Sequence, residues 1–198
     1  MSFYIKEGRF EAKLGNLDLP ITTLIYNFES ANGCTGKLIG KCKVWDICYA
    51  QKAETTWPTV TPYRERQRAF WKKCTPRGFV NKLAHIPFKT FRFGEAGEID
   101  SQESLDKLND IAKILWDKRR VVTYGYSCME HLDFRGSIAR IKLSGYPAKE
   151  GTTGSTMVVE KGAEIPEGWH RCNGKAGKCT RCNICTLPNI INVAMEKH

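Results

Sequence analysis

Apolar residues recur along this chain either at the spacing of a β-strand or at the spacing of an α-helix, and these patterns predict its strands and helices. The stretch Leu19–Phe28 is rich in β-branched and aromatic residues, which predicts a buried strand. The three phenylalanines of Phe88–Glu98 predict a second strand, which enters a Gly-rich turn. After Asp100 or Ser101 as the N-cap, apolar residues recur at helical spacing up to Arg120 and predict a helix.

The remaining elements follow from composition and from helix-breaking prolines. They are helices over residues 61–74 and 77–86 and strands over residues 121–127, 139–146 and 155–162. The strand–helix–strand order of residues 88–127 predicts a parallel βαβ unit. We therefore expect an α/β fold with an incomplete, (βα) barrel-like parallel sheet. It would form a single domain, 1–198, with its core in 1–160 and a cysteine-rich C-terminal loop in 161–198.

Composition narrows the class of protein. A chain of 198 residues with 41% hydrophobic residues can bury one core, and no apolar run approaches the ~20 residues of a membrane helix. The N-terminus has no apolar signal core, so we expect a cytoplasmic protein without membrane contact. The net charge of +10 favours a polyanionic partner such as nucleic acid, although basic residues among the last cysteines could instead offset thiolate charge.

Seven of the nine cysteines fall into two groups, which is typical of metal binding in a reducing compartment. The C-terminal group contains Cys172, Cys179, Cys182 and Cys185. Its CxxCxxC run is similar to the ferredoxin arrangement for an iron–sulfur cluster, with a four-cysteine zinc site as the alternative.

The N-terminal group contains Cys34, Cys42 and Cys48, in a Gly-rich segment that we expect to be a loop after the first strand. Three thiolates on a four-iron cluster leave one iron open. A fourth ligand could come from elsewhere, and the candidates are Cys74, Cys128, His85 and His131. The two groups could also form one site together, or two zinc sites.

Three segments follow the carboxyl ends of predicted strands: the first cysteine segment, the FGEAGE turn and the end of VVTYGYSC. Since ligands of such folds bind outside the carboxyl ends of the strands, we expect these segments to meet at one site. Ser127 would present a hydroxyl to a bound cofactor there.

The order of these pieces resembles that of the radical SAM enzymes. There, a three-cysteine loop holds a [4Fe-4S] cluster, S-adenosylmethionine binds the open iron, and a Gly-Gly-Glu-type turn contacts its amino group. The resemblance implies that Gly94 and Glu95 bind the cofactor, that Glu95 is the catalytic acid, and that the C-terminal cysteines hold an auxiliary cluster. The chain departs from the pattern in its Cx7Cx5C spacing and in the single glycine before Glu95.

Four features recur together over roughly residues 30–186: a cysteine segment ending in Cys48-Tyr49-Ala50, the segment from Phe91 to Ala112, an aromatic strand and a final multi-cysteine run. In these features the chain more closely resembles a small phage family, gene product 88. The resemblance implies a phage-type, cluster-binding protein in the host cytoplasm.

Three functions remain open at this point. The first is an iron–sulfur protein that acts as a radical-SAM-like enzyme with one or two [4Fe-4S] clusters. The second is a non-catalytic nucleic-acid-binding protein stabilised by zinc or a cluster, for which the basic, aromatic segment from Trp57 to Lys73 is the candidate surface. The third is an electron-transfer protein. The sequence decides neither whether the chain is an enzyme nor its substrate or oligomeric state.

Overall fold

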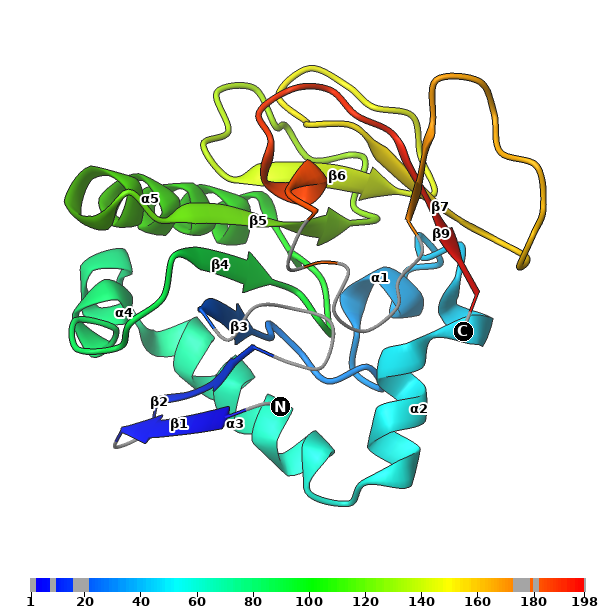
Figure 1. Cartoon of the computed structure of the whole chain (residues 1–198). Coiled ribbons are helices and arrows are strands. Elements are labelled where there is room, and N and C mark those ends of the chain that lie inside the picture. Colours follow the sequence, from blue (N-terminus) through cyan, green and yellow to red (C-terminus); the bar gives the residue numbers. More distant parts are fainter. Residues whose placement is uncertain (1–2, 8–9, 16–21, 173–178, 180–181, 198) are drawn as a thin grey trace.

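The computed structural model describes residues 3–7, 10–15, 22–172, 179 and 182–197 (Figure 1). Its strands are β1 (Phe3–Glu7), β2 (Phe10–Leu14), β3 (Thr23–Tyr26), β4 (Thr90–Phe93), β5 (Val122–Ser127), β6 (Arg140–Ser144), β7 (Ser155–Val159), β8 (His170–Cys172) and β9 (Val193–Glu196). Its helices are α1 (Thr35–Leu38), α2 (Tyr49–Thr56), α3 (Val60–Lys73), α4 (Pro76–Lys82) and α5 (Gln102–Arg119), with short 3-10 turns η1 (Trp45–Ile47) and η2 (Ile184–Thr186).

All the described strands belong to one mixed sheet, in the order β1-β2-β3-β4-β5-β6-β7-β9-β8. The pairs β1–β2 and β2–β3 are antiparallel, and every later pair is parallel. From β3 to β7 each strand lies beside the one before it, so the chain moves across the sheet in one direction. The α/β prediction is therefore confirmed, with a mostly parallel sheet.

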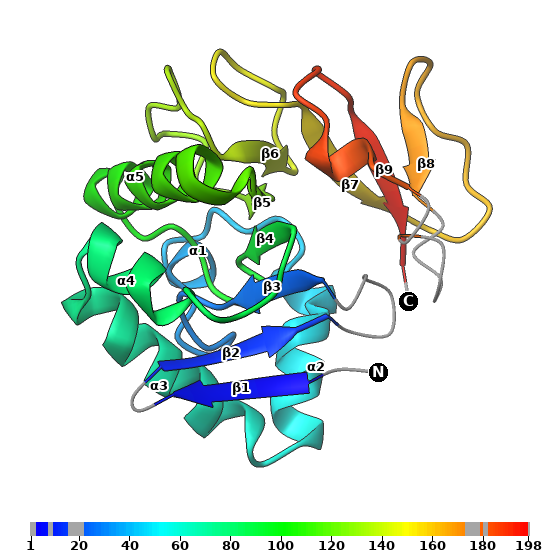
Figure 2. The ribbon, with the colours of Figure 1, turned by 60° about the vertical axis from the view of Figure 1, so that its left-hand side comes forward.

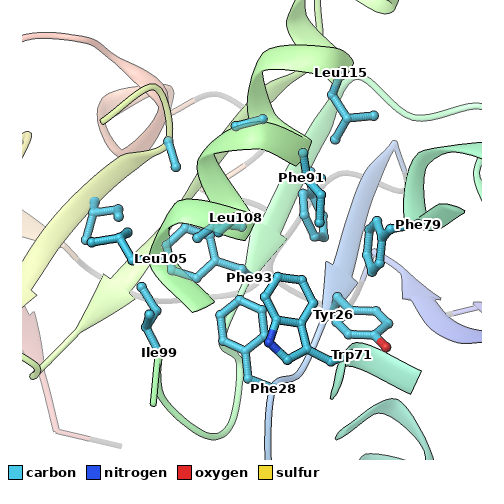
Figure 3. Packing of buried hydrophobic residues seen from close by; sticks show 14 of the residues in the cluster. Tyr26, Phe28, Trp71, Phe79, Phe91, Phe93, Ile99, Leu105, Leu108 and Leu115 are labelled. Atoms are coloured by element: carbon cyan, nitrogen blue, oxygen red, sulfur yellow. The ribbon is translucent and has the colours of Figure 1, made fainter. Parts of the chain in front are cut away.

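Helices α3, α4 and α5 cover one face of this sheet (Figure 2). Helix α5 begins where the Ser101 hydroxyl accepts a hydrogen bond from the Ser104 nitrogen, as its capping pattern predicts. Of its apolar stripe, Leu105, Leu108 and Leu115 are fully buried, whereas Trp116 at its end is exposed. Figure 3 shows this stripe against an aromatic cluster in which the rings of Phe28 and Trp71 lie 4.5 Å apart.

The opposite face of the sheet carries polar side chains. In β4, the buried Phe91 and Phe93 belong to the core under the helices, so Arg92 between them points to the other face. The pairing of β4, β5 and β6 places Tyr124, Tyr126 and Lys142 on this face too. The turn η2, with Cys185 of the C-terminal group, packs against β5 and β6 of this sheet.

Several expectations need correction. The segment after β3 is not simply a loop, because it contains α1, η1 and α2. The hairpin formed by β1 and β2 was not predicted from the sequence. Residues 161–198 are not only a cysteine-rich loop, since they supply β8 and β9 to the sheet. Of the predicted strand Leu19–Phe28, Thr23–Tyr26 is confirmed, and residues 19–21 lie outside the described residues.

Across the described residues, every helix is too short or too polar to cross a lipid bilayer.

Candidate functional site

The loops that follow β3, β4 and β5 meet at the carboxyl edge of the sheet, as expected, and carboxylates hold them together. Glu29, after β3, accepts hydrogen bonds from the Thr35 nitrogen (2.7 Å) and from the Glu98 nitrogen (3.4 Å). Glu98, after β4, accepts from the Ser127 hydroxyl (2.7 Å) and the Cys128 nitrogen (3.1 Å). The two carboxylates thus link the first cysteine segment to the ends of β4 and β5.

Close packing accompanies these hydrogen bonds. A Cβ added to Gly36, in α1, would lie 2.4 Å from the Cys128 sulfur. A Cβ added to Gly97 would lie 2.5 Å from the Glu29 nitrogen, and Gly97 also has a positive φ of 77°. A residue with a Cβ would therefore clash with the Cys128 side chain at position 36 and with the Glu29 backbone at position 97.

The three cysteines of the N-terminal group are half-buried and free of disulfides. Cys34 is the N-cap of α1 and Cys48 is the N-cap of α2. Burial raises the pKa of the Cys34 thiol to about 12. A hydrogen bond from Cys128 lowers the pKa of Cys42 to about 6, and the same contact, together with burial, raises the pKa of Cys128. Of the four candidates for a fourth ligand, Cys128 is therefore the one placed beside this group.

The other candidates lie elsewhere. Cys74 ends α3, where its thiol donates to the Trp71 carbonyl at 3.4 Å. His85 and His131 are both exposed, and no hydrogen bond or ion pair places them at the cysteine segment in the described structure.

A buried ion pair anchors the N-terminal cysteine segment to α2 and α3. Glu54 accepts hydrogen bonds from the backbone nitrogens of Ala31 (2.6 Å) and Asn32 (3.1 Å) and from Arg64 Nη1 (2.8 Å). The side chains of Glu54 and Arg64 are 0% and 4% exposed. Arg64 also donates to the Ala50 carbonyl at 2.9 Å. This network ties the chain just before Cys34 to the helix that begins after Cys48.

Gly94 and Glu95 lie at the same edge. Gly94 has a positive φ of 64°, and its nitrogen donates to the Tyr26 carbonyl at 2.9 Å. The Glu95 carboxylate forms an ion pair with Lys13 of β2. Burial alone would raise the pKa of Glu95, but Lys13 and Arg92 outweigh it and hold this pKa below the ordinary value. Glu95 is therefore an ionised carboxylate with a partner.

Ser127 is fully buried, and its hydroxyl is directed to Glu98. It also accepts a hydrogen bond from the Met129 nitrogen at 3.1 Å. Burial raises the pKa of Glu98 to about 7. In this structure Ser127 thus links two loops, and Glu98, which the sequence suggested to be a solvated turn residue, is hydrogen-bonded at the centre of this edge.

The C-terminal group lies across the polar face of the sheet. Turn η2, which contains Cys185, packs against β5 and β6 (Figure 1). The Tyr126 hydroxyl and the Cys185 sulfur form a hydrogen bond of 2.9 Å. Burial raises the pKa of Cys185, and the Tyr126 hydroxyl, Lys142 and Arg92 act against that rise. Cys172 is near enough to disfavour the Cys185 thiolate.

Two cations near Cys185 have no carboxylate ion pair among the described residues. Lys142 is 1% exposed, and its ammonium donates to the carbonyls of Thr153 (2.5 Å) and Ile191 (2.8 Å). Arg92 Nη2 donates to the Tyr49 hydroxyl at 3.3 Å, while its buried Nε has no hydrogen-bond partner. Each of these two cations lies between two apolar residues of a strand, in the triplets FRF and IKL. That pattern in the sequence could have revealed both cations.

The thiols of the two cysteine groups are the kind of ligand that zinc and iron–sulfur clusters prefer. In the described part of the chain, their positions do not form a site for a single metal ion. Cys172, Cys179 and Cys185 are half-buried, Cys182 is exposed, and all are free thiols. Nowhere in the described ranges do three His, Cys, Asp or Glu side chains stand close enough to share one metal ion. A four-iron cluster sets a looser condition, because each of its cysteines binds a different iron atom.

Three arginines of the basic segment proposed for nucleic acid have carboxylate partners. Arg64 pairs with Glu54, and Arg66 and Arg68 pair with Glu11 and Glu29. Trp71 belongs to the core. Arg64, Arg66 and Arg68 are therefore paired, while Lys72 and Lys73 at the end of helix α3 are exposed. Three aromatic residues before this helix, Trp45, Tyr49 and Trp57, are each more than half exposed.

The fold and the site define a class of protein: an α/β protein whose mostly parallel sheet carries two groups of free cysteines, one at its carboxyl edge and one on its polar face. A family model described as gene product 88 matches residues 5–127. The chain belongs to this phage gene-product family. The match includes the N-terminal cysteines and ends before the C-terminal group. No curated protein and no solved structure matches the chain.

Proposed function

We propose that this protein binds iron–sulfur clusters through its two cysteine groups. The observation that carries the proposal is the setting of Cys185. Its sulfur and the Tyr126 hydroxyl form a hydrogen bond of 2.9 Å, and the buried Lys142 and the partly buried Arg92 lie near it without carboxylate ion pairs among the described residues. A buried cation without an anionic partner destabilises the folded protein, and a thiolate-bound cluster carries the negative charge that would compensate these two cations. A cysteine thiol that only packs in the core would not need two cations near it.

The N-terminal group extends the proposal to radical-SAM-like chemistry in the host cell. Cys34, Cys42 and Cys48 would hold the cluster that supplies the electron for reductive cleavage of S-adenosylmethionine. The strand order from β3 to β7, in one direction, supports a barrel-like scaffold for this reaction. The resemblance to radical SAM enzymes assigns Glu95 to the amino group of the cofactor, and Glu95 is an ionised carboxylate that already binds one ammonium group, that of Lys13.

The first test is anaerobic purification with a visible spectrum and a count of iron, sulfide and zinc. About eight irons per chain would place a cluster on each group, and about four would leave one group without a cluster. Reduced protein would then be incubated with S-adenosylmethionine, and 5′-deoxyadenosine would be measured. A colourless protein containing zinc would rule out cluster binding. A brown protein that does not cleave the cofactor would limit the function to electron transfer.

A second candidate function is nucleic-acid binding by a metal-stabilised fold. The observation that favours it is the exposure of Trp45, Tyr49 and Trp57 next to the exposed Lys43 and Lys52. Aromatic rings among lysines suit base stacking with phosphate contact. A Trp45→Ala/Trp57→Ala double variant should weaken binding to single-stranded DNA, measured at two salt concentrations. Binding that is weak in the parent protein, or insensitive to salt, would eliminate this candidate.

A further inference from the structure

The two cysteine groups are joined by a continuous series of contacts across the polar face of the sheet. Tyr49 follows Cys48 directly in the chain, and its hydroxyl accepts from Arg92 Nη2 at 3.3 Å. The Arg92 guanidinium lies over the ring of Tyr126, with 5.6 Å between its central carbon and the ring centroid. The Tyr126 hydroxyl contacts the Cys185 sulfur at 2.9 Å. Arg92 is the one charged group in this series.

Arg92 forms no direct ion pair with a carboxylate among the described residues, although it is near enough to Glu95 to help lower the pKa of that group. The nearby carboxylate is Glu95, and it is engaged by Lys13. Tyr49 offers Arg92 only a neutral hydroxyl, whose own hydrogen bond goes to the Glu95 carbonyl at 2.7 Å. The buried Nε of Arg92 has no acceptor in the described part of the chain. A desolvated cation in this position acts strongly on any negative charge nearby.

We propose that Arg92 is a positioning residue shared by both cysteine groups and that its charge sets the reduction potentials of the centres they hold. The inference rests on the proposed cluster binding. Reduction adds one negative charge to a centre, so a nearby fixed cation favours the reduced state and raises the potential. The effect should be larger for the C-terminal centre, because Arg92 stacks on the residue that contacts Cys185. The effect on the potential should be smaller for the N-terminal centre, because Arg92 contacts that group only through Tyr49.

The test measures the midpoint potential of each centre by EPR-monitored redox titration of the anaerobically purified protein. Arg92→Met should lower both potentials, and the C-terminal one by about a tenfold change in the one-electron equilibrium, or about 59 mV. Arg92→Lys, which keeps the charge, should return both toward the parent values. Tyr126→Phe keeps the ring beneath Arg92 but removes the hydroxyl, so it should shift the C-terminal centre alone.

Arg77→Met is the matched control, because Arg77 is an exposed arginine on α4. It should change neither potential. Equal potentials in Arg92→Met and the parent, or a shift confined to one centre, would overturn the inference while cluster binding stood. Absence of iron from the parent protein would instead refute the proposed function on which the inference depends.

Discussion

The ion pair between Glu54 and Arg64 should be one of the largest single contributions to the stability of the cysteine segment. Glu54→Ala would leave the 4%-exposed Arg64 without its carboxylate and the nitrogens of Ala31 and Asn32 without their acceptor. Breaking a buried pair from one side costs about 3–5 kcal/mol. Of a total stability of roughly 5–15 kcal/mol, this is a large fraction.

Urea unfolding followed by circular dichroism would measure the loss directly. Thermal unfolding should show a Tm lower by about 6–20 °C, from about 2–4 °C per kcal/mol for a chain of this size. Glu65→Ala is the matched control, because Glu65 is an exposed glutamate on the same helix as Arg64, α3, and its 3.9 Å ion pair with Arg68 is solvated. It should change stability little.

A double variant makes the reasoning sharper. Glu54→Leu with Arg64→Met removes both charges and fills similar volume, so it should recover much of the loss. The argument would be refuted if Glu54→Ala cost less than about 1 kcal/mol, the level of a surface pair. It would also be refuted if the double variant were less stable than Glu54→Ala. The single variant should in addition lose metal from the N-terminal group, since the chain before Cys34 loses its anchor.

Three further predictions concern the same edge of the sheet. Gly97→Ala should destabilise by about 1–3 kcal/mol more than Gly40→Ala in urea unfolding, because both have positive φ but only Gly97 would bring a Cβ within 2.5 Å of backbone; equal losses would refute the close packing. Glu98 has a pKa raised to about 7, so its protonated form stabilises the fold below about pH 4, and this contribution is lost as the pH rises through 7. The free energy of unfolding should therefore fall more between pH 5 and 8 in the parent than in Glu98→Gln, and parallel pH profiles would contradict this. Cys48→Ser and Cys179→Ser should each remove the metal of one group only, by metal analysis, and loss of all metal from either folded variant would rule out two independent centres.

The sequence was sufficient for the elements whose patterns are local. The α5 stripe and its Ser101 cap lie within one helix, and β4 and β5 follow from their apolar residues. The convergence of three loops at one edge also followed, because parallel strands end on the same side of a sheet. The cysteine groups were visible as spacing, and their metal content stays a prediction.

Other features depend on partners far apart in the chain. Arg64 was one of a run of basic residues, and only the fold shows that this arginine closes a buried pair with Glu54. The β1–β2 hairpin and β8–β9 are short strands whose pairing partners stabilise them, so their local pattern is weak. The contact between Tyr126 and Cys185 joins residues 59 positions apart.

The sequence by itself thus determined which residues could serve as ligands, where the strands β3 to β7 lie and where the longer helices α3 and α5 lie, because these depend on residue type and local spacing. The tertiary structure alone decided which charges are neutralised and which remain free. That is why Arg64 became part of the scaffold, while Arg92, between two core phenylalanines, lies on the polar face with the tyrosines Tyr49 and Tyr126 as its neighbours. Burial and pairing arise between distant segments, and no local pattern specifies them.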